Sequence, residues 1–484
     1  MVFNSVHFVV FFAAVYALYR LLPHRGQNWL LLVASYYFYA SWDWRFLGLL
    51  LASTVVDFFC GRYIAAREAP RQRKAALILS LAFNLSMLGF FKYFNFFADN
   101  LHALFGVCGF RVDFFTLRVL LPIGISFYTF ITMSYVIDVY RRTIEPARDL
   151  VEFGVFVAYF PHLVAGPILR ASLLLVQVSK PRIIMSSQVA EGLWLILYGF
   201  FKKMFVADNL APLVNATFAG SAHPGGLEVV LAVLAFAFQI YGDFSGYSDI
   251  ARGTSKLLGI ELNLNFRFPY FAATPQEFWA NWHMSLSAWL RDYLFLPLSY
   301  AFSKRLDGVG WLGLRDDFWI YASATMITML LGGLWHGAAW TFVLWGAYQG
   351  LLLVVFKVAT GGRRKRRRRS HPVVVGLGIA GMFALTCYGW LLFRAESVAQ
   401  IASMTKAIFT GFDPNMVALT TMGLPLVGYG APLALLQAIE WKTDNLDVVF
   451  RWPAPLRWAV AGVLAYLIVL FGNFEGSKFI YFQF

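Results

Sequence analysis

Residues 278–295 read FWANWHMSLSAWLRDYLF, and residues 329–350 read MLLGGLWHGAAWTFVLWGAYQG. Each stretch places one histidine, His283 or His336, inside apolar sequence that is rich in tryptophan. An ionisable ring is costly to bury in such surroundings, so it must either be satisfied by a neighbour or serve in chemistry. The segment 266–350, which contains both histidines, is therefore the predicted core of the protein.

The composition of the whole chain points to a membrane. Of its 484 residues, 59% are hydrophobic and only 14% are charged, whereas soluble domains are about 25% charged. A chain with so few charges and with 49 Phe, 23 Tyr and 16 Trp does not cover a water-facing surface. We therefore predict a polytopic integral membrane protein, in which the first apolar run is a retained span and not a cleaved signal peptide.

The spacing of apolar runs predicts the number of helices. A membrane-crossing helix needs about 20 mostly apolar residues, and we expect roughly 11 to 13 transmembrane or re-entrant helices. The candidates lie near 3–22, 28–40, 45–62, 75–97, 119–140, 150–168, 190–206, 227–250, 317–335, 338–360, 373–393, 416–438 and 456–472. Gly and Pro break several of them, as in YFPHLVAGPI from residue 159, and these broken segments are expected to line a cavity.

The basic residues predict a topology. Seven of the charges behind the net charge of +14 belong to the run RRKRRRR at 363–369. Basic loops between apolar spans orient a helix bundle against an anionic cytoplasmic leaflet, so this pattern indicates a lipid membrane as partner and no nucleic acid. The segment 361–371 is the predicted basic cytoplasmic loop, and the N-terminus is expected on the outer side.

The cysteines and the known motif patterns predict neither a metal site nor a bound cofactor. Cys60, Cys108 and Cys387 lie far apart in apolar sequence, with no CxxC or Cys/His pairing. The chain also lacks a Gly-rich phosphate cradle, a Ser-His-Asp or Cys-His signature and an HExxH motif.

The first histidine follows a strong helix start. Thr274 is a predicted N-cap, Pro275 suits the first helical position, and Glu277 closes a capping box. We expect one helix from here to Pro297. It would place Trp279, His283, Leu286 and Leu290 on one face.

An Arg291–Asp292 pair and tryptophans on several sides predict that this helix is interfacial or tilted. It would then carry His283 to the floor of a cavity.

The second histidine lies among Gly332, Gly333 and Gly337, next to Trp335. Small residues at this spacing allow helices or a ligand to approach the backbone closely. The ring of His336 is therefore expected in a narrow space between close-packed helices. For both histidines two interpretations remain open, a structural hydrogen bond to a neighbouring carbonyl and a catalytic role.

Two acidic residues, Asp243 and Asp249, lie six apart in IYGDFSGYSDIARG. They would pair with Arg252 or Arg267, or contact a polar ligand, and the sequence does not separate ion pairing from ligand binding.

A neutral imidazole in a poorly hydrated, Trp-lined setting suits general-base catalysis. It would take the proton of a hydroxyl that attacks an activated acyl group, and the exclusion of water would prevent hydrolysis. The same site would also suit movement of protons or of a solute.

The motif HMSLSAWLRDYLF, followed by GGLWHGAAWTFVLWG, resembles the membrane-bound O-acyltransferase family, whose hallmark is an intramembrane histidine at the position of His336. Further stretches resemble its bacterial alginate O-acetylation branch. They are MLGFFKYFNFF from residue 87, LPIGISFYTF from 121, YVIDVYRR from 135, FPHLVAGPILRA from 160, GDFSGYSDIARGTSKLLGIELNLNFRFPYFA from 242 and the terminal FIYFQF.

The resemblance implies an all-α fold in which a ring of helices surrounds a central tunnel, as a single membrane-embedded acyltransferase domain over 1–484. It implies a multi-pass protein of the bacterial inner membrane, a cytoplasmic acyl donor, acetyl-CoA, and transfer of the acetyl group to an exopolysaccharide such as alginate. A separate periplasmic or membrane-anchored polysaccharide acetyltransferase is the implied partner.

Within this resemblance His336 is the base or transient acyl carrier, and His283 positions or relays. Trp335 walls the tunnel, and Arg291 and Asp292 orient their helix. Relatives that acetylate peptidoglycan or transfer D-alanine to teichoic acids share the core motifs, and a transporter or polymer-export component without acyl chemistry is the alternative of another class.

Overall fold

The computed structural model describes residues 1–109, 118–164, 166–219, 224–306, 315–361, 371–474 and 479–480. All regular elements within these residues are helical, and none is a strand, so the predicted all-α class is confirmed. The chain forms two compact units. Unit 1 comprises Met1–Ile196 and Ser248–Asn263, and unit 2 comprises Leu197–Tyr247 and Leu264–Phe484. The arginine run predicted to form a cytoplasmic loop lies outside the described residues.

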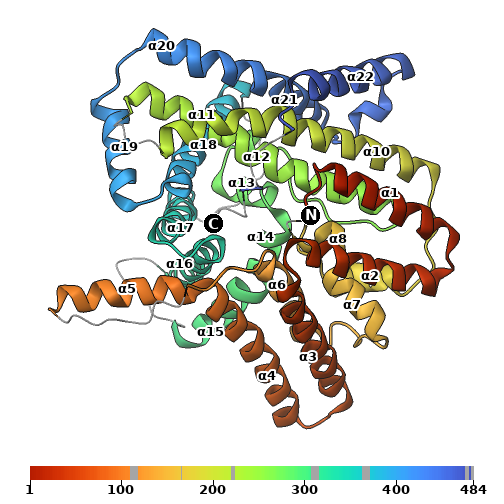
Figure 1. Ribbon diagram of the computed structural model, residues 1–484. Helices are drawn as coiled ribbons and strands as arrows, with labels where there is room; N and C mark the ends of the chain where they lie inside the picture. Colours follow the sequence, from red (N-terminus) through yellow and green to blue (C-terminus); the bar gives the residue numbers. More distant parts are fainter. Residues whose placement is uncertain are drawn as a thin grey trace. The chain divides into compact units, whose positions relative to one another are not determined.

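Unit 1 contains the N-terminal helices (Figure 1). They are α1 (Val6–Leu21), α2 (His24–Asp43), η1 (Trp44–Phe46), α3 (Leu47–Ala66), α4 (Pro70–Leu88), η2 (Gly89–Tyr93), α5 (Phe94–Val107), α6 (Ile125–Tyr140), α7 (Leu150–Ala158), α8 (Phe160–Leu163) and α9 (Ala171–Val178). Two further helices, α10 (Ser186–Phe200) and α12 (Gly226–Leu257), contribute residues to both units.

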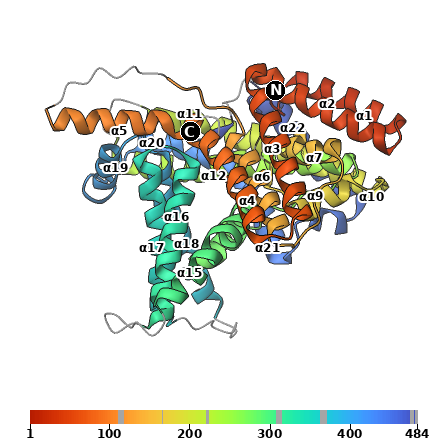
Figure 2. The same cartoon turned by 90° about the horizontal axis from the view of Figure 1, so that it is seen from below.

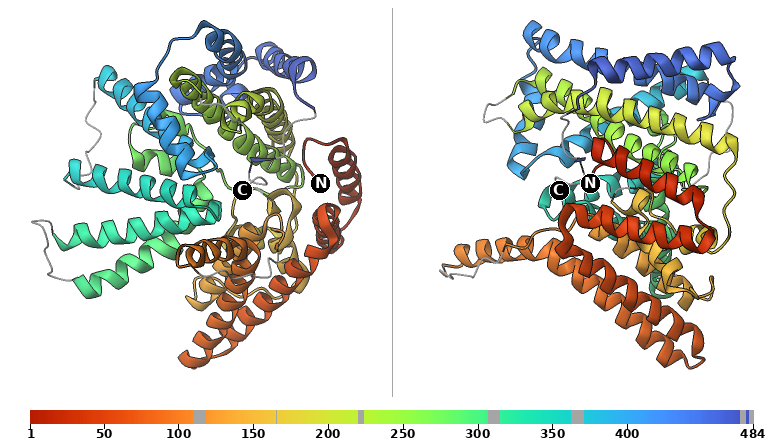
Figure 3. Two further views of the ribbon diagram at one scale, coloured as in Figure 1. Left: turned by 60° about the vertical axis from the view of Figure 1, so that its left-hand side comes forward. Right: turned by 45° about the vertical axis from the view of Figure 1, so that its right-hand side comes forward.

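Unit 2 holds the remaining helices. They are η3 (Phe201–Ala207), α11 (Asp208–Phe218), η4 (Pro269–Phe271), α13 (Pro275–Asn281), α14 (Met284–Leu290), η5 (Arg291–Phe295), α15 (Leu296–Leu306), α16 (Asp316–His336), α17 (Trp340–Ala359), α18 (Pro372–Arg394), α19 (Val398–Thr410), α20 (Met416–Ala418), η6 (Leu419–Gly423), α21 (Leu424–Thr443), η7 (Val448–Arg451) and α22 (Ala454–Phe471). In this unit α15, α16, α17 and α18 pack in sequence order, as Figures 2 and 3 show.

Eight helical segments of the described chain are long and apolar enough to cross a membrane. They are His24–Ala66, Pro70–Val107, Gly226–Leu257, Asp316–His336, Trp340–Ala359, Pro372–Arg394, Met416–Thr443 and Ala454–Phe471. They differ sharply in burial, because 72% of the most apolar window of α12 is buried but only 11% of that of α22. A helix that is apolar all round and buried belongs to a core, whereas the exposed apolar surface of α22 suits lipid. This is a multi-pass membrane protein.

The predicted span at 150–168 proved to be two short helices. Tyr159 leaves the helical conformation between α7 and α8, and α7 has only 9 residues. Neither piece reaches the length of about 20 residues that a crossing needs.

A buried polar cluster connects three helices of unit 1. The carboxylate of Asp57 on α3 accepts hydrogen bonds from Ser80 at 2.5 Å and from Asn84 at 2.8 Å, both on α4. The side-chain oxygen of Asn84 in turn accepts from Ser53 and from Thr132 on α6. Interhelical hydrogen bonds of this kind hold membrane helices together where apolar packing gives no preference over lipid.

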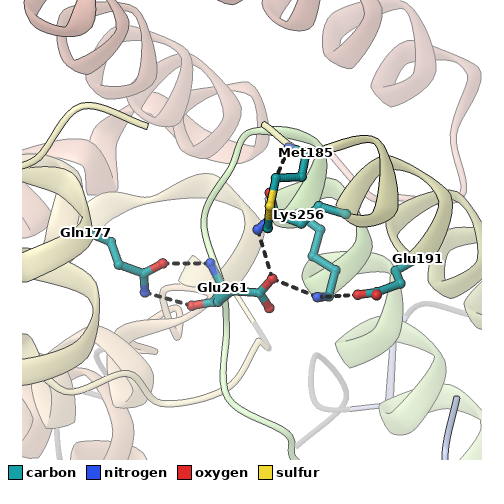
Figure 4. A network of polar contacts seen from close by, with 6 residues as sticks. Gln177, Met185, Glu191, Lys256 and Glu261 are labelled. Atoms are coloured by element: carbon teal, nitrogen blue, oxygen red, sulfur yellow. Dashed lines mark hydrogen bonds and ion pairs between the residues drawn. The ribbon is translucent and has the colours of Figure 1, made fainter. Parts of the chain in front are cut away.

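A second network fixes the chain that follows α12 (Figure 4). The ammonium group of Lys256 contacts the carboxylates of Glu191 at 2.9 Å and Glu261 at 2.7 Å. The side chain of Gln177 pairs with both the N–H and the C=O of Glu261, at 2.8 and 3.0 Å. These contacts set the direction of the extended segment that leads toward residue 265.

Candidate active site

The helix around His283 begins as predicted. The Thr274 hydroxyl accepts a hydrogen bond from the N–H of Glu277 at 3.1 Å, and Pro275 is the first residue of α13. The Glu277 carboxylate reaches back to the N–H of Ala273 at 2.9 Å. The capping box is thus present, but the Glu277 carboxylate accepts from the N–H of Ala273 and not from that of the N-cap residue Thr274.

The prediction of one continuous helix to Pro297 is wrong. The helix α13 stops at Asn281, and His283 adopts the left-handed conformation, with φ 42° and ψ 54°. The helix α14 begins at Met284, and Pro297 lies inside α15 instead of ending a helix. Because of this break, His283 does not share a helical face with Trp279, Leu286 and Leu290.

The backbone and the side chain of Asn265 hold the break in place. Its carbonyl accepts from the N–H of Met284 at 2.9 Å, and its side-chain oxygen accepts from the N–H and the hydroxyl of Ser285 at 3.2 and 2.7 Å. These bonds satisfy donors at the start of α14 that a new helix leaves without partners. A residue 18 positions upstream therefore decides the conformation of His283.

His283 is completely buried. Its ring meets that of Phe244 edge-on at a centroid distance of 4.6 Å, and the Trp335 ring lies at 6.0 Å. The break at His283 lies outside the eight candidate spans, and burial lowers the pKa of His283 to about 3. The imidazole is therefore neutral at physiological pH.

His336 is the last residue of α16 and is also buried. Its ring lies 5.0 Å from Trp335, 5.0 Å from Trp345 on α17 and 5.4 Å from Phe393 on α18, measured between ring centroids. Rings of its own helix and of two neighbouring helices thus enclose it. The structure brings His283 and His336 together through Trp335, as members of one aromatic cluster.

Glycines allow the close approach that surrounds His336, as predicted. A Cβ at Gly333 would overlap the carbonyl oxygen of Phe342, and one at Gly346 would overlap that of Met329. A Cβ at Gly337 would overlap the Phe342 ring. The backbones of α16 and α17 touch because neither helix carries a side chain at these points.

The remaining wall of the cluster is built around Trp282. Its ring lies 4.8 Å from Trp390 and 5.0 Å from Phe266, and Trp390 stacks on Trp345 at 6.4 Å. This wall replaces water by aromatic carbon around both histidines. Among the residues that the structure describes, no group of three or more His, Cys, Asp or Glu side chains is arranged to hold a metal ion.

Asp243 has a partner that the sequence did not suggest. Its carboxylate lies 2.7 Å from the ammonium group of Lys203, which also contacts Asp208 at 2.9 Å, and all three side chains are buried. Burial lowers the pKa of Lys203, but the carboxylates of Asp243 and Asp208 outweigh this effect and raise it. The pairing of Asp243 with Arg252 or Arg267 was therefore predicted wrongly, because Lys203 lies 40 residues upstream, in the π-helical turn η3.

The ion pair also fixes the end of the described chain. The second carboxylate oxygen of Asp243 accepts from the N–H of Ile480 at 2.7 Å. The ring of Phe479 lies 6.0 Å from that of Phe244, which packs on His283. Asp243 is therefore adjacent in the sequence to Phe244, whose ring packs on His283.

The other predicted site residues lie outside the aromatic cluster. Asp249 pairs with Arg252 at 3.3 Å, one of the partners predicted for it. Arg291 and Asp292 pair with each other at 2.7 Å in the π-helical turn η5, where the Arg291 side chain is 62% exposed. These contacts favour structural roles over contact with a ligand.

Residues 9–393 match the profile of the MBOAT, membrane-bound O-acyltransferase family. The probable alginate O-acetylase AlgI of Azotobacter vinelandii is 41% identical over 430 residues, which is 87% of this chain and 82% of that protein. That of Pseudomonas aeruginosa is 40% identical over 412 residues, 85% of this chain and 75% of that protein.

A peptidoglycan O-acetyltransferase of Helicobacter pylori is 31% identical over 441 residues, which is 84% of this chain and 80% of that protein. These matches favour the enzyme over the transporter that the sequence left open as an alternative. The chain belongs to the membrane-bound O-acyltransferase family and is an O-acyltransferase.

Proposed function

We propose that this enzyme moves an acetyl group from a cytoplasmic donor, acetyl-CoA, across the inner membrane of a bacterium for O-acetylation of an exopolysaccharide such as alginate. The observation that carries the proposal is the burial of His336 among aromatic rings. The indole of Trp335 contacts both its ring and that of His283. The relatives named as probable alginate O-acetylases are 38–41% identical to the chain, and the peptidoglycan enzyme is 31% identical. Peptidoglycan is therefore the second candidate acceptor.

In the proposed reaction, a nitrogen of His336 accepts the proton of the attacking hydroxyl as its oxygen bonds to the acetyl carbon. The carbon–sulfur bond of the thioester breaks, and the proton passes from the imidazolium to the leaving thiolate. The products are an ester and free CoA. The aromatic wall keeps water, the competing nucleophile, away from the thioester.

A transient acyl carrier is the other role that the site supports. The nitrogen of His336 would itself bond to the acetyl carbon and displace the thiolate. The oxygen of a hydroxyl would then bond to this carbon as the carbon–nitrogen bond breaks, and the proton of the hydroxyl would pass to the thiolate. In either course His283 positions His336 or relays its proton, and Trp335 walls the tunnel.

The chain is proposed to act as one membrane-embedded domain whose core is 266–350. A separate periplasmic or membrane-anchored polysaccharide acetyltransferase would receive the acetyl group and pass it to the polymer. The surrounding partner is the lipid bilayer.

Replacement of His336 tests the proposal. In a strain without its own copy of the gene, His336→Ala is expected to reach the membrane in normal amounts and to lower polymer acetylation by about 10²–10⁴-fold, the usual effect of losing a general base. The control is His102→Ala, which removes an exposed histidine of α5. Normal acetylation by His336→Ala would refute the catalytic role.

Incubation of the purified enzyme with radiolabelled acetyl-CoA separates the two roles. Label that stays on denatured wild-type protein and is absent from His336→Ala supports the carrier. Release of CoA that depends on an added hydroxyl acceptor, with no retained label, supports the base.

A further inference from the structure

We infer that unit 2 contains a second site, in which one acyl chain of a membrane phospholipid binds. The site is an apolar cavity of about 460 Å³, within the range of roughly 300–1,000 Å³ typical of small-molecule sites. Residues of four elements line it, namely α12, η4, α18 and α21. They are Phe238, Tyr241, Tyr270, Phe271, Gly376, Ile379, Ala380, Phe383, Leu433, Ala434, Gln437 and Trp441.

The two tyrosine hydroxyls and the side-chain amide of the glutamine in the lining are bonded to protein. The Tyr270 hydroxyl donates to the carbonyl of Ala237 at 2.6 Å, and the side-chain amide of Gln437 donates to the Tyr241 hydroxyl. The rest of the lining is apolar or aromatic. A hydrocarbon chain therefore suits the lining of the cavity, whereas a charged group would lose its hydration there without gaining hydrogen-bond partners.

The helices beside the cavity carry surface that suits lipid. Leu377 on α18 is 70% exposed and Leu435 on α21 is 64% exposed, and both lie next to cavity residues in the sequence. Exposed leucines at this density on apolar helices face acyl chains and not water. The cavity is therefore flanked by helix surface that suits lipid.

The rim has the features of a membrane interface. Trp441, on the last turn of α21, stacks on Phe271 at 4.9 Å, and tryptophan is enriched at the level of lipid headgroups. Lys442 is exposed beside it, and the exposed Arg267 contacts Asp444 at 2.9 Å. Asp444 offsets the charge of Arg267, so Lys442 is the cation that would attract the headgroup phosphate of a phospholipid whose acyl chain enters the cavity.

The cavity shares a wall with the active site. Tyr241 and Tyr270, which line the cavity, lie 6.3 and 6.0 Å from the ring of Trp282, the residue before His283. A bound acyl chain would pack against Tyr241 and Tyr270 and thereby support the ring of Trp282.

Two glycines of α18 provide a matched test. Gly376 lines the cavity and Gly381 does not, and a Cβ at either position meets no atom within 4 Å. Glycine to tryptophan at either position also improves helix propensity, so both variants are expected to fold. Only Gly376→Trp places a large side chain inside the cavity.

The experiment uses the full-length enzyme in liposomes of phosphatidylglycerol with a diazirine in one acyl chain. After irradiation, mass spectrometry is expected to find label on the α21 peptide that contains residues 433–441. Gly376→Trp should lower this label at least about tenfold, whereas Gly381→Trp should leave it unchanged. Ala380→Phe, which fills the same cavity, serves as the second variant if Gly376→Trp is poorly expressed.

Three results would overturn the inference. They are unchanged labelling in Gly376→Trp and Ala380→Phe, an equal loss in Gly381→Trp, and displacement of the label by added acetyl-CoA, which would assign the cavity to the acyl donor. The measurement needs no acetyl transfer, so its failure is distinguishable from failure of the proposed function.

Discussion

His283 and His336 contact the same indole ring, that of Trp335, at centroid distances of 6.0 and 5.0 Å. The two histidines lie 53 residues apart: His283 precedes the first residue of α14, and His336 is the last residue of α16. A movement of the indole therefore affects both rings, which gives the site a physical route by which one histidine influences the other.

This shared contact predicts that the effects of two substitutions are not additive. His283→Gln and Trp335→Phe should each lower acetyl transfer. The loss of transition-state stabilisation in the double variant should be smaller than the sum of the two single losses by at least about 1 kcal/mol. A double-mutant cycle of kcat/KM with acetyl-CoA measures the coupling. Strict additivity would show that the indole does not connect the two rings.

The left-handed backbone at residue 283 separates the structural role of His283 from its chemical one. Glycine adopts φ 42° without the penalty of about 1–2 kcal/mol that other residues carry, so His283→Gly should melt at a higher temperature than His283→Ala. Both variants lack the imidazole and should lose activity to the same extent. If His283→Gly were as active as the wild type, the role of His283 would be limited to the backbone turn between α13 and α14.

The low pKa of His283 predicts a loss of stability in acid. Its folded pKa of about 3 lies below the unfolded value of about 6.5, so the unfolded state binds more protons between these values. The stability contributed by the neutral ring is complete above pH 6.5 and falls by at most about 1.4 kcal/mol per unit as the pH drops toward 3.

Thermal unfolding of detergent-solubilised enzyme between pH 7 and pH 4.5 measures this effect. His162 is also buried, with its pKa lowered to about 4 by burial, and contributes in the same direction. The His283→Gln variant should therefore lose part of the pH dependence of the wild type. An identical pH dependence would contradict the buried neutral state of His283.

The buried Lys203 predicts a strong effect on folding. Lys203→Met leaves the carboxylates of Asp208 and Asp243 buried without their cation, which typically costs about 3–5 kcal/mol. The measurements are membrane yield and melting temperature. Combining Lys203→Met with Asp208→Asn and Asp243→Asn should restore much of the loss, because the uncompensated charges are then removed.

The exposed pair Arg315–Asp317 supplies the control, since both side chains are more than three-quarters exposed and 3.5 Å apart. Arg315→Gln should change stability by less than about 0.5 kcal/mol. Similar effects at Lys203 and Arg315 would show that the buried pair is not important for the fold.

The contact between α16 and α17 predicts a cost for any side chain at Gly333. The added methyl of Gly333→Ala would overlap the carbonyl of Phe342, and the resulting strain of about 1–3 kcal/mol exceeds the gain in helix propensity. Gly462→Ala on α22 meets no atom within 4 Å and should be neutral or slightly stabilising. Melting temperatures of the two variants check this, and equal values would contradict the close packing.

Several features of the fold and site followed from local sequence. The scarcity of charge required a membrane, the residues Thr274 and Glu277 started a helix through their own hydrogen bonds, and the glycines at 333 and 337 allowed helices to touch. Each of these effects acts within one or two helical turns or on the composition as a whole. Periodicity and composition therefore predict them.

Other features depended on residues that are distant along the chain. The break at His283 needs Asn265, the burial of Asp243 needs Lys203, and the enclosure of His336 needs Phe393 from α18. A lysine inside the predicted span 190–206 does signal a buried charge, but no local pattern identifies which distant residues these three partners contact.

The sequence alone therefore determined that the chain enters a membrane as helices and that it carries two unusual histidines. Only the tertiary structure decided that both are buried against one indole and that His283 occupies a helix break. The physical reason is that solvent exclusion and hydrogen-bond capping arise from contacts between segments, which become defined only when the chain folds.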